Sequence, residues 1–206
     1  MMKIGITGGI GSGKSVVSEL LRCMGYPVFD TDREAKQLME QSVVIRAKLT
    51  EVFGDQVYAN GKLNRPYLAS LIFHDVAARL QVNASVHPEV RSCFRNWCEK
   101  QHSDIVFFES AILYESDFHH LADAIWVISA PEKVRLKRTV RRDGAAPEQV
   151  LARMRSQLAQ EEKEARADFV IRNNDQEPLI PQVISALDGL RKTRCVKIDT
   201  THVCGV

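Results

Sequence analysis

The sequence predicts an α/β fold built on a five-stranded parallel sheet. Short apolar runs with the character of buried strands fall at residues 3–7, 27–29, 104–108, 124–129 and 168–171. Helical patterns separate these runs, and strands that alternate with helices are typical of βαβ crossovers and a parallel sheet. Helices cover both faces of such a sheet, which explains why the runs are apolar throughout. A glycine-rich segment directly after the first run adds a ligand-binding loop.

That segment, residues 8–15, reads Gly-Gly-Ile-Gly-Ser-Gly-Lys-Ser. It fits the phosphate-binding loop pattern G-x-x-x-x-G-K-S/T, in which glycines let successive backbone N–H groups point at phosphate oxygens. Apolar residues at helical spacing follow, and they predict a helix that begins near Gly13 with its positive dipole end toward the anion. Lys14 is then expected to reach the β- and γ-phosphates of a nucleotide, and the Ser15 hydroxyl to bind Mg²⁺.

Two other interpretations of the loop are weaker. The strand before it and the helix after it argue against a flexible turn that binds nothing. The dinucleotide-binding pattern G-x-G-x-x-G also starts within the loop, and the acids Asp30 and Asp32 follow at about the required 20 residues. Its third glycine position holds Lys14 or Val16, however, which favours the phosphate-binding loop.

Two carboxylates follow the second strand. Asp30 and Asp32 stand at its carboxyl end, the edge at which open α/β sheets bind ligands. One could accept the proton of an attacking hydroxyl, while the other positions Mg²⁺ through water or caps the helix that begins near Arg33. Simple capping by both is the alternative. We favour Asp32 as the base because it lies further along the chain.

The second and third strands are separated by about 75 residues, too many for a simple crossover. Amphipathic helices are predicted at 33–53 and 66–100, with a turn at 59–62 between them. Asn64 is a plausible N-cap with Pro66 in the first turn. This insertion predicts a substrate-binding subdomain. His87 precedes a proline within it, where a histidine is more often a turn or cap residue than a catalytic one.

A second helical insertion, residues 131–166, is very polar. Three arginines recur at i, i+3 and i+7 on one face of its first helix: Arg135, Arg138 and Arg142. Guanidinium groups over a transferring phosphate would stabilise its charge, so we expect a mobile lid, with a merely solvated charged face as the alternative. The helix is expected to break at Asp143-Gly144 and to restart at Pro147.

Polar residues also end the later strands. The third strand ends in Glu109, and the segment after it places Glu115 near the same edge. Asn173 and Asn174 follow the last strand and could hydrogen-bond a purine edge, or could form a capping turn. After Arg194 the chain has little pattern, and fraying is expected.

Composition excludes several classes of protein. The net charge of +2 implies no strong nucleic-acid or membrane field, and no apolar run approaches the length of a membrane span. Five scattered cysteines suggest neither a disulfide framework nor a zinc site. The chain starts directly in its first strand without a signal peptide, so a cytoplasmic protein is expected. The sequence leaves the oligomeric state open, and a monomer is favoured.

Together these motifs resemble dephospho-coenzyme A kinase, a family of P-loop kinases for small molecules. The resemblance is collinear over about residues 3–190. It rests on residues 6–15, 30–32, 35, 61–65, 86–90, 111–115, 136–138, 142–143, 167–171 and 173–174.

The resemblance implies a three-layer P-loop kinase fold in three parts. These are a nucleotide-binding core (1–32, 101–130 and 167–194), a helical coenzyme A-binding subdomain (33–100) and a lid (131–166). It implies transfer of the ATP γ-phosphate to the ribose 3′-hydroxyl of dephospho-coenzyme A, with Mg²⁺.

The same resemblance implies residue roles. Asp32, Lys14 and Arg138 would be catalytic. Nucleotide contacts would come from Gly11, Ser12, Gly13, Lys14, Ser15, Val16, Arg142 and Asn173, with Ser15 on the metal. Asp30, Arg65 and His87 would contact the acceptor.

Three residues depart from the family pattern. Val16 replaces a threonine and can offer the nucleotide only its backbone. Ala111 opens a segment in which the family has Pro-Leu-Leu, which puts the local backbone in question, and Arg172 stands where an acid is common. The rivals are other small-metabolite kinases, of nucleoside or shikimate type, and a P-loop switch protein. The former have smaller acceptor insertions, and the latter carry an Asn-Lys-x-Asp signal that this sequence lacks.

Overall fold

The computed structural model describes residues 1–201, and its account of side chains leaves out 73–74 and 193–201. Five parallel strands form one sheet in the order β2-β5-β1-β6-β7. Their bounds are Met2–Thr7 (β1), Val28–Asp30 (β2), Ile105–Glu109 (β5), Ala124–Ser129 (β6) and Phe169–Arg172 (β7). The five predicted strands are therefore confirmed to within one or two residues. The phosphate-binding loop leaves the central strand, β1.

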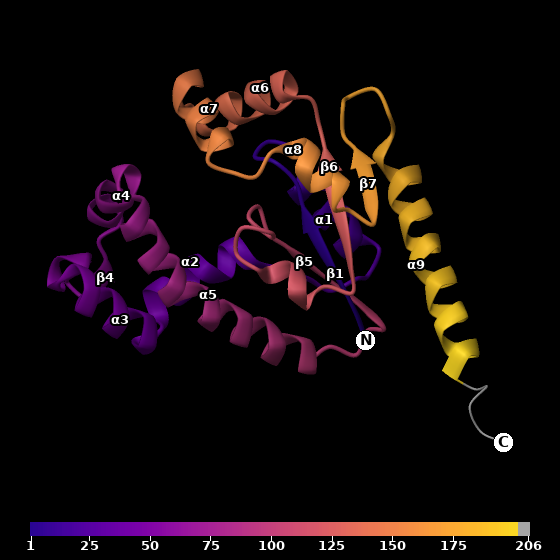
Figure 1. Ribbon diagram of the computed structural model, residues 1–206, viewed down its shortest axis with the longest axis horizontal. Helices are drawn as coiled ribbons and strands as arrows, with labels where there is room; N and C mark the ends of the chain where they lie inside the picture. Colours follow the sequence, from indigo (N-terminus) through magenta and orange to yellow (C-terminus); the bar gives the residue numbers. More distant parts are fainter. Residues whose placement is uncertain (202–206) are drawn as a thin grey trace.

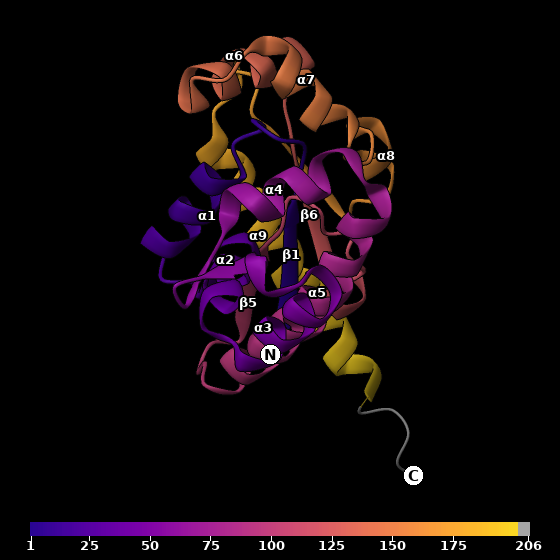
Figure 2. The same cartoon turned by 90° about the vertical axis from the view of Figure 1, so that its left-hand side faces the viewer.

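Helices cover both faces of the sheet (Figures 1 and 2). Helices α1 (Lys14–Cys23) and α9 (Leu179–Thr201) pack on one face, against a core that includes Phe107 and Trp126. Helix α5 (Val76–Glu99) packs on the other face, where Phe94 and Phe108 meet. Side chains alternate between the two faces along β5, so adjacent residues of one strand contribute to both cores.

The first insertion contains four helices rather than the two predicted. They are α2 (Thr31–Gln41), α3 (Val43–Phe53), α4 (Arg65–His74) and α5. Ser42 breaks the first predicted helix because its hydroxyl accepts a hydrogen bond from the Ile45 N–H (3.3 Å). Asp75 breaks the second and caps α5 at the Ala77 and Ala78 N–H groups. Single capping residues interrupt a helix without disturbing the apolar spacing on either side, so periodicity alone misses them.

Other details of the insertion agree with the sequence. Asn64 caps α4 at the Tyr67 N–H (3.3 Å). The predicted turn joins two short strands, β3 (Tyr58–Ala59) and β4 (Lys62–Leu63), which follow a 3₁₀ turn η1 (Asp55–Val57). Pro88 lies inside α5 and does not interrupt it, so His87 is a helix residue rather than a turn or cap residue.

The second insertion lies above the carboxyl ends of the strands (Figures 1 and 2). Helix α6 (Glu132–Asp143) ends at Gly144, whose φ of +63° suits a residue without a side chain. Helix α7 (Pro147–Arg155) restarts at the predicted proline, and α8 (Gln160–Ala165) leads into β7. The predicted break and restart are thus confirmed.

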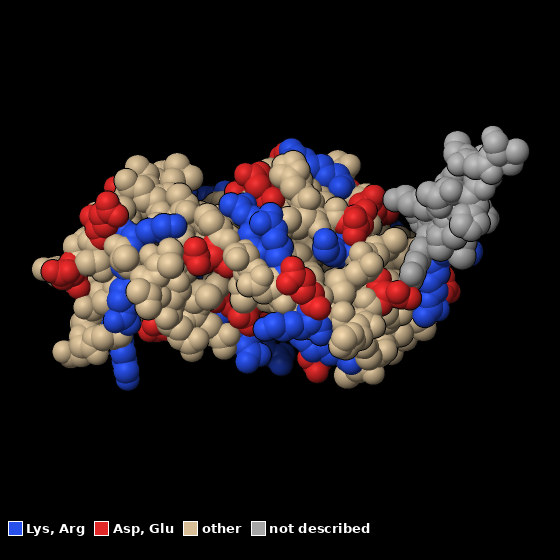
Figure 3. All heavy atoms as spheres, turned by 90° about the horizontal axis from the view of Figure 1, so that it is seen from below, with Lys and Arg blue, Asp and Glu red and all other residues tan. Residues whose placement is uncertain are grey.

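The remaining elements complete the chain. A 3₁₀ turn η2 (Phe118–Leu121) precedes β6. Helix α9 continues past Arg194 to Thr201, so the fraying expected after Arg194 is not seen that far, and residues 202–206 lie outside the described part. Within residues 1–201, no helix is long and apolar enough to cross a membrane. On the face in Figure 3, acidic and basic side chains are interspersed.

Phe94 anchors the insertion to the sheet and gives a test of this packing. Its ring is 1% exposed and lies 4.7 Å from the Phe108 ring centroid and 5.2 Å from that of Phe29. We expect Phe94→Ala to lower the free energy of unfolding by about 3–5 kcal/mol, the usual result of a cavity of that size. Urea unfolding measures it, with the 61% exposed Leu80 of the same helix as control (Leu80→Ala). Equal effects of the two changes would contradict this packing.

Candidate active site

The phosphate-binding loop joins the end of β1 to the start of α1. Gly13 precedes the helix with a φ of +93°, a conformation that glycine adopts readily and other residues rarely. The Lys14 ammonium folds back over the loop and donates to the carbonyls of Gly8 (3.1 Å) and Gly9 (3.4 Å). Ser15 and Val16, in the first turn of α1, are exposed to solvent. The loop therefore presents a helix N-terminus, a lysine and a hydroxyl at one open edge, as anion binding requires.

Three carboxylates lie beside this loop. Asp30 caps α2 by accepting from the Arg33 N–H (2.9 Å), and it pairs in register with Glu109 on β5. Capping occupies Asp30, whereas Asp32 stands in the first turn of α2, near enough to the loop lysine for its charge to lower the Asp32 pKa. Of the interpretations left open by the sequence, the structure therefore favours one cap and one candidate base.

Burial shifts the pKa values of Asp32, Glu109 and Lys14. Asp32 keeps an exposed surface, yet the surrounding cleft desolvates its carboxylate and raises its pKa. The Lys14 ammonium and the Ala111 backbone N–H lower that pKa in part, while the charge of Asp30 raises it further. Burial also raises the pKa of Glu109 and lowers that of Lys14. A carboxylate with a raised pKa beside a candidate phosphate site suits proton acceptance.

The three arginines on this face of α6 differ in their partners. Arg138 donates from Nη2 to Asn173 Oδ1 (3.3 Å) and pairs with Asp175, while its buried Nη1 has no hydrogen-bond partner within the described residues. Arg135 is 8% exposed and donates to the Ala130 carbonyl (3.0 Å).

Arg142 pairs with Asp143 at the end of the same helix (2.7 Å), and Asp143 also pairs with Arg153. The three guanidinium groups of this face therefore have different partners, a backbone carbonyl for Arg135 and acidic side chains for Arg138 and Arg142. Arg138 retains an unused donor beside the loop, since its Nη1 lies 3.9 Å from the position a Cβ on Gly13 would take.

Asn173 connects the lid with the loop. Its Nδ2 donates to the Ser12 carbonyl (2.8 Å), and its Oδ1 accepts from Arg138. Each end of its amide thus has one partner within the protein, and each keeps one further position, a second N–H on Nδ2 and a second lone pair on Oδ1. Asn174 forms the alternative capping turn, with Oδ1 accepting from the N–H groups of Gln176 and Glu177.

Two further candidates lie on the insertion. Arg65 is half exposed and donates from Nε (3.2 Å) and Nη2 (2.9 Å) to one carboxylate oxygen, Oε1, of Glu40. His87 is half buried on α5, edge-on to Phe118, and desolvation lowers its imidazole pKa. The imidazole is therefore neutral at pH 7 and offers one donor and one acceptor.

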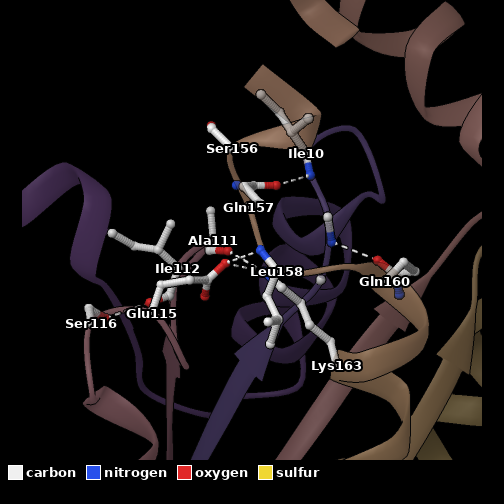
Figure 4. Close-up of polar contacts among 12 residues, drawn as sticks. Ile10, Ala111, Ile112, Glu115, Ser116, Ser156, Gln157, Leu158, Gln160 and Lys163 are labelled. Atoms are coloured by element: carbon white, nitrogen blue, oxygen red, sulfur yellow. Dashed lines mark hydrogen bonds and ion pairs between the residues drawn. The ribbon is translucent and has the colours of Figure 1, made fainter. Parts of the chain in front are cut away.

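Sequence reasoning missed two glutamines that hold the loop from the lid side (Figure 4). Gln157 Oε1 accepts from the Ile10 N–H (2.9 Å), and Gln160 Oε1 accepts from the Gly9 N–H (2.8 Å). They are about 150 residues from their partners, so no local pattern could have indicated them. A cavity of about 600 Å³ beside them is lined by Gly9 but not by the candidate phosphate ligands Lys14 and Ser15.

Comparisons with known proteins agree with this geometry. The family model described as dephospho-CoA kinase matches residues 2–178. A curated dephospho-CoA kinase of Bacteroides fragilis is 48% identical, over 90% of this chain and 91% of that one. The crystal structure of TT1252 from Thermus thermophilus is 35% identical with a TM-score of 0.80, covering 93% of this chain and 97% of that one. A dephospho-CoA kinase from Campylobacter jejuni shares the fold at 23% identity and a TM-score of 0.66, covering 93% and 98%.

The raised pKa of Asp32 predicts an effect on stability. The folded protein binds the Asp32 proton more tightly than the unfolded chain does, because the pKa of Asp32 is raised on folding. The stability that this proton contributes is therefore lost as the pH rises from the unfolded-state pKa through the folded-state pKa. We therefore expect Asp32→Asn to be more stable than wild type at pH 7, and this gain to shrink toward pH 3.5. Urea unfolding at both pH values measures it, with the exposed Asp55 as control (Asp55→Asn). A less stable Asp32→Asn protein at pH 7 would contradict the assignment.

Proposed function

Because the chain belongs to the dephospho-coenzyme A kinase family, we propose that it transfers the ATP γ-phosphate to the ribose 3′-hydroxyl of dephospho-coenzyme A. The observation that carries this proposal is the Asp32 carboxyl group close to Lys14 of the phosphate-binding loop, so close that each charge shifts the pKa of the other group. The hydroxyl oxygen attacks the γ-phosphorus, and the bond from that phosphorus to the ADP oxygen breaks. The hydroxyl proton passes to Asp32, so the products are ADP and coenzyme A.

Asp32 is the proposed base. Its raised pKa brings its proton affinity closer to the working pH, which favours general-base catalysis. Asp30 is engaged in capping α2 and would help to position the acceptor rather than take its proton.

The phosphates would lie on the loop amides of Gly11, Ser12 and Gly13, with the backbone of Val16 adjoining. Lys14 would exchange the Gly8 and Gly9 carbonyls for β- and γ-phosphate oxygens. Mg²⁺ fits the exposed Ser15 hydroxyl, a hard oxygen donor at the same edge. When bound, the ion would neutralise charge on the β- and γ-phosphates.

Lid arginines would act on the transferring group. Arg138 supports this role best, because its Nη1 is buried beside Gly13 with no hydrogen-bond partner in the described chain. Such a preorganised donor stabilises charge that develops during transfer. Arg142 would assist from the next turn, after exchanging Asp143 for phosphate, and Asn173 would hold Arg138 against the loop.

The long insertion favours a large acceptor over a small one. Four helices stand between β2 and β5, and Arg65 and His87 on them offer a cation and a neutral imidazole to a phosphorylated, adenine-bearing acceptor. A kinase of shikimate or nucleoside type acts on a smaller acceptor and would need a shorter insertion. The lack of an Asn-Lys-x-Asp signal argues against a guanine-nucleotide switch.

The acceptor is tested directly by ADP release. Wild-type enzyme with ATP and Mg²⁺ should release ADP faster on addition of dephospho-coenzyme A, and not on addition of shikimate or adenosine. Asp32→Asn should keep ATP affinity within about threefold and lose turnover by about 10²–10⁴-fold, the usual contribution of a positioned base. No stimulation by dephospho-coenzyme A would overturn the proposed function.

Arg138 has a matched control on its own helix. We expect Arg138→Ala to lower kcat by about 10²–10³-fold while weakening ATP binding much less, because its free donor acts mainly on the transition state. Arg141→Ala removes an exposed arginine from the same helix and should leave kcat within about twofold. Steady-state kinetics and ATP calorimetry separate the two effects. A loss confined to ATP affinity would make Arg138 a binding residue only.

A further inference from the structure

The segment that leads from the lid back to the core touches both sides of the candidate active site (Figure 4). We call residues 157–163 the return segment. Its glutamines, Gln157 and Gln160, hold the phosphate-binding loop. Its other contacts reach the segment after β5, where the Leu158 N–H donates to Glu115 Oε1 (2.8 Å).

Lys163 makes the strongest of these contacts. It is completely buried, and its ammonium lies 3.0 Å from Glu115 Oε1 and 2.9 Å from the Ala111 carbonyl. A buried ion pair gives little net stability, because apolar side chains of similar volume would avoid the desolvation cost. The pair is better explained by the orientation that it imposes on the segment it holds.

The segment that Lys163 holds lies against the candidate base. Ala111 accepts from Lys163 at its carbonyl, and its own backbone N–H lies close enough to Asp32 to lower the pKa of that carboxyl. Just before it, the Glu109 carbonyl accepts from the Thr31 hydroxyl (2.8 Å), which joins the same stretch of chain to the start of α2. Ser116 closes this segment on itself, since its N–H (2.9 Å) and hydroxyl (2.6 Å) both donate to the Ile112 carbonyl. Residues 111–116 therefore form a compact unit, and a change at its Lys163 end is passed to Asp32.

We propose that the Lys163–Glu115 pair is a positioning device that fixes the Ala111 segment beneath Asp32, while Gln157 and Gln160 fix the phosphate-binding loop. One return segment then sets the distance between the proton acceptor and the phosphate site. Lys163 touches no reacting atom, so it is a positioning residue rather than a catalytic one. This inference rests on the proposed function.

The test separates orientation from stability. Lys163→Met alone leaves Glu115 without its partner and is expected to melt at a lower temperature. The double variant Lys163→Met with Glu115→Gln removes both charges, so its melting temperature should largely recover. Its kcat with saturating ATP and dephospho-coenzyme A should nevertheless stay about 10–100-fold below wild type, because Ala111 has lost its ammonium donor. ATP affinity, measured by calorimetry, should stay within about threefold.

Three further variants sharpen the result. Glu115→Gln alone keeps an oxygen for the Leu158 N–H and the Lys163 ammonium but removes the counter-charge of Lys163, so it should melt at a lower temperature than wild type and lose about 3–10-fold in kcat. Gln157→Leu should weaken ATP binding by more than about threefold, in contrast to the double variant, because it loosens the phosphate-binding loop itself. Lys133→Met removes an exposed lysine of α6 and should change neither quantity.

Recovery of wild-type kcat in the double variant, or equal losses of kcat and ATP affinity in it, would overturn the positioning role. Unchanged kcat in Glu115→Gln would do the same if the double variant does not fold. A wild-type protein that ignores dephospho-coenzyme A would instead overturn the proposed function, so the two failures are distinguishable.

Discussion

The close packing of α6 on the phosphate-binding loop is the constraint on which the rest of the site depends. A Cβ on Gly9 would lie 2.3 Å from Arg135 Nη1, and one on Gly11 would lie 2.4 Å from the Arg135 carbonyl oxygen. Gly11, whose φ is +79°, is required by space as well as by backbone freedom, because the atom it would meet belongs to the backbone of α6. A side chain on Gly9 would have to displace the Arg135 guanidinium. Because Arg135 is fixed on the loop, Arg138 one turn later falls beside Gly13 with its free donor. The loop thus determines where the lid can present charge.

The charge distribution in the cleft follows from the chemistry rather than from stability. Three acids, Asp30, Asp32 and Glu109, converge near Lys14, and burial disfavours the charged forms of Asp32, Glu109 and Lys14. A protein selected for stability alone would replace several of them. Phosphoryl transfer needs a proton acceptor on one side of the phosphate and cations on the other, and both kinds of group must be partly desolvated to act. The cleft keeps that unfavourable arrangement because α2, β5 and the loop are held by apolar packing below it.

Local signals account for what the sequence predicted well. The strands and the loop follow from unbroken apolar runs and from glycines at fixed spacing, so they could be located to within one or two residues. The helix breaks at Ser42 and Asp75 could not, because one capping residue leaves the apolar periodicity intact. The choice between Asp30 and Asp32 needed the observed cap. Gln157 and Lys163 gave no signal at all, because their partners lie far away in the chain.

Both ends of the proposed lid, residues 131–166, are fixed to the core, and this limits the movements that are open to it. At its start, Arg135 is buried on the phosphate-binding loop; at its end, Gln160 binds the same loop. Neither contact can open without disturbing the site that the lid serves. If residues 131–166 close as the proposed lid, we therefore expect the movement at the tip, where Gly144 joins α6 to α7 and Arg142 is held by an exposed ion pair. Such pairs are weak in water and exchange readily for phosphate oxygens. A lid fixed at both ends and loose at its tip can change its arginine contacts without moving the groups that orient Asp32 and Lys14.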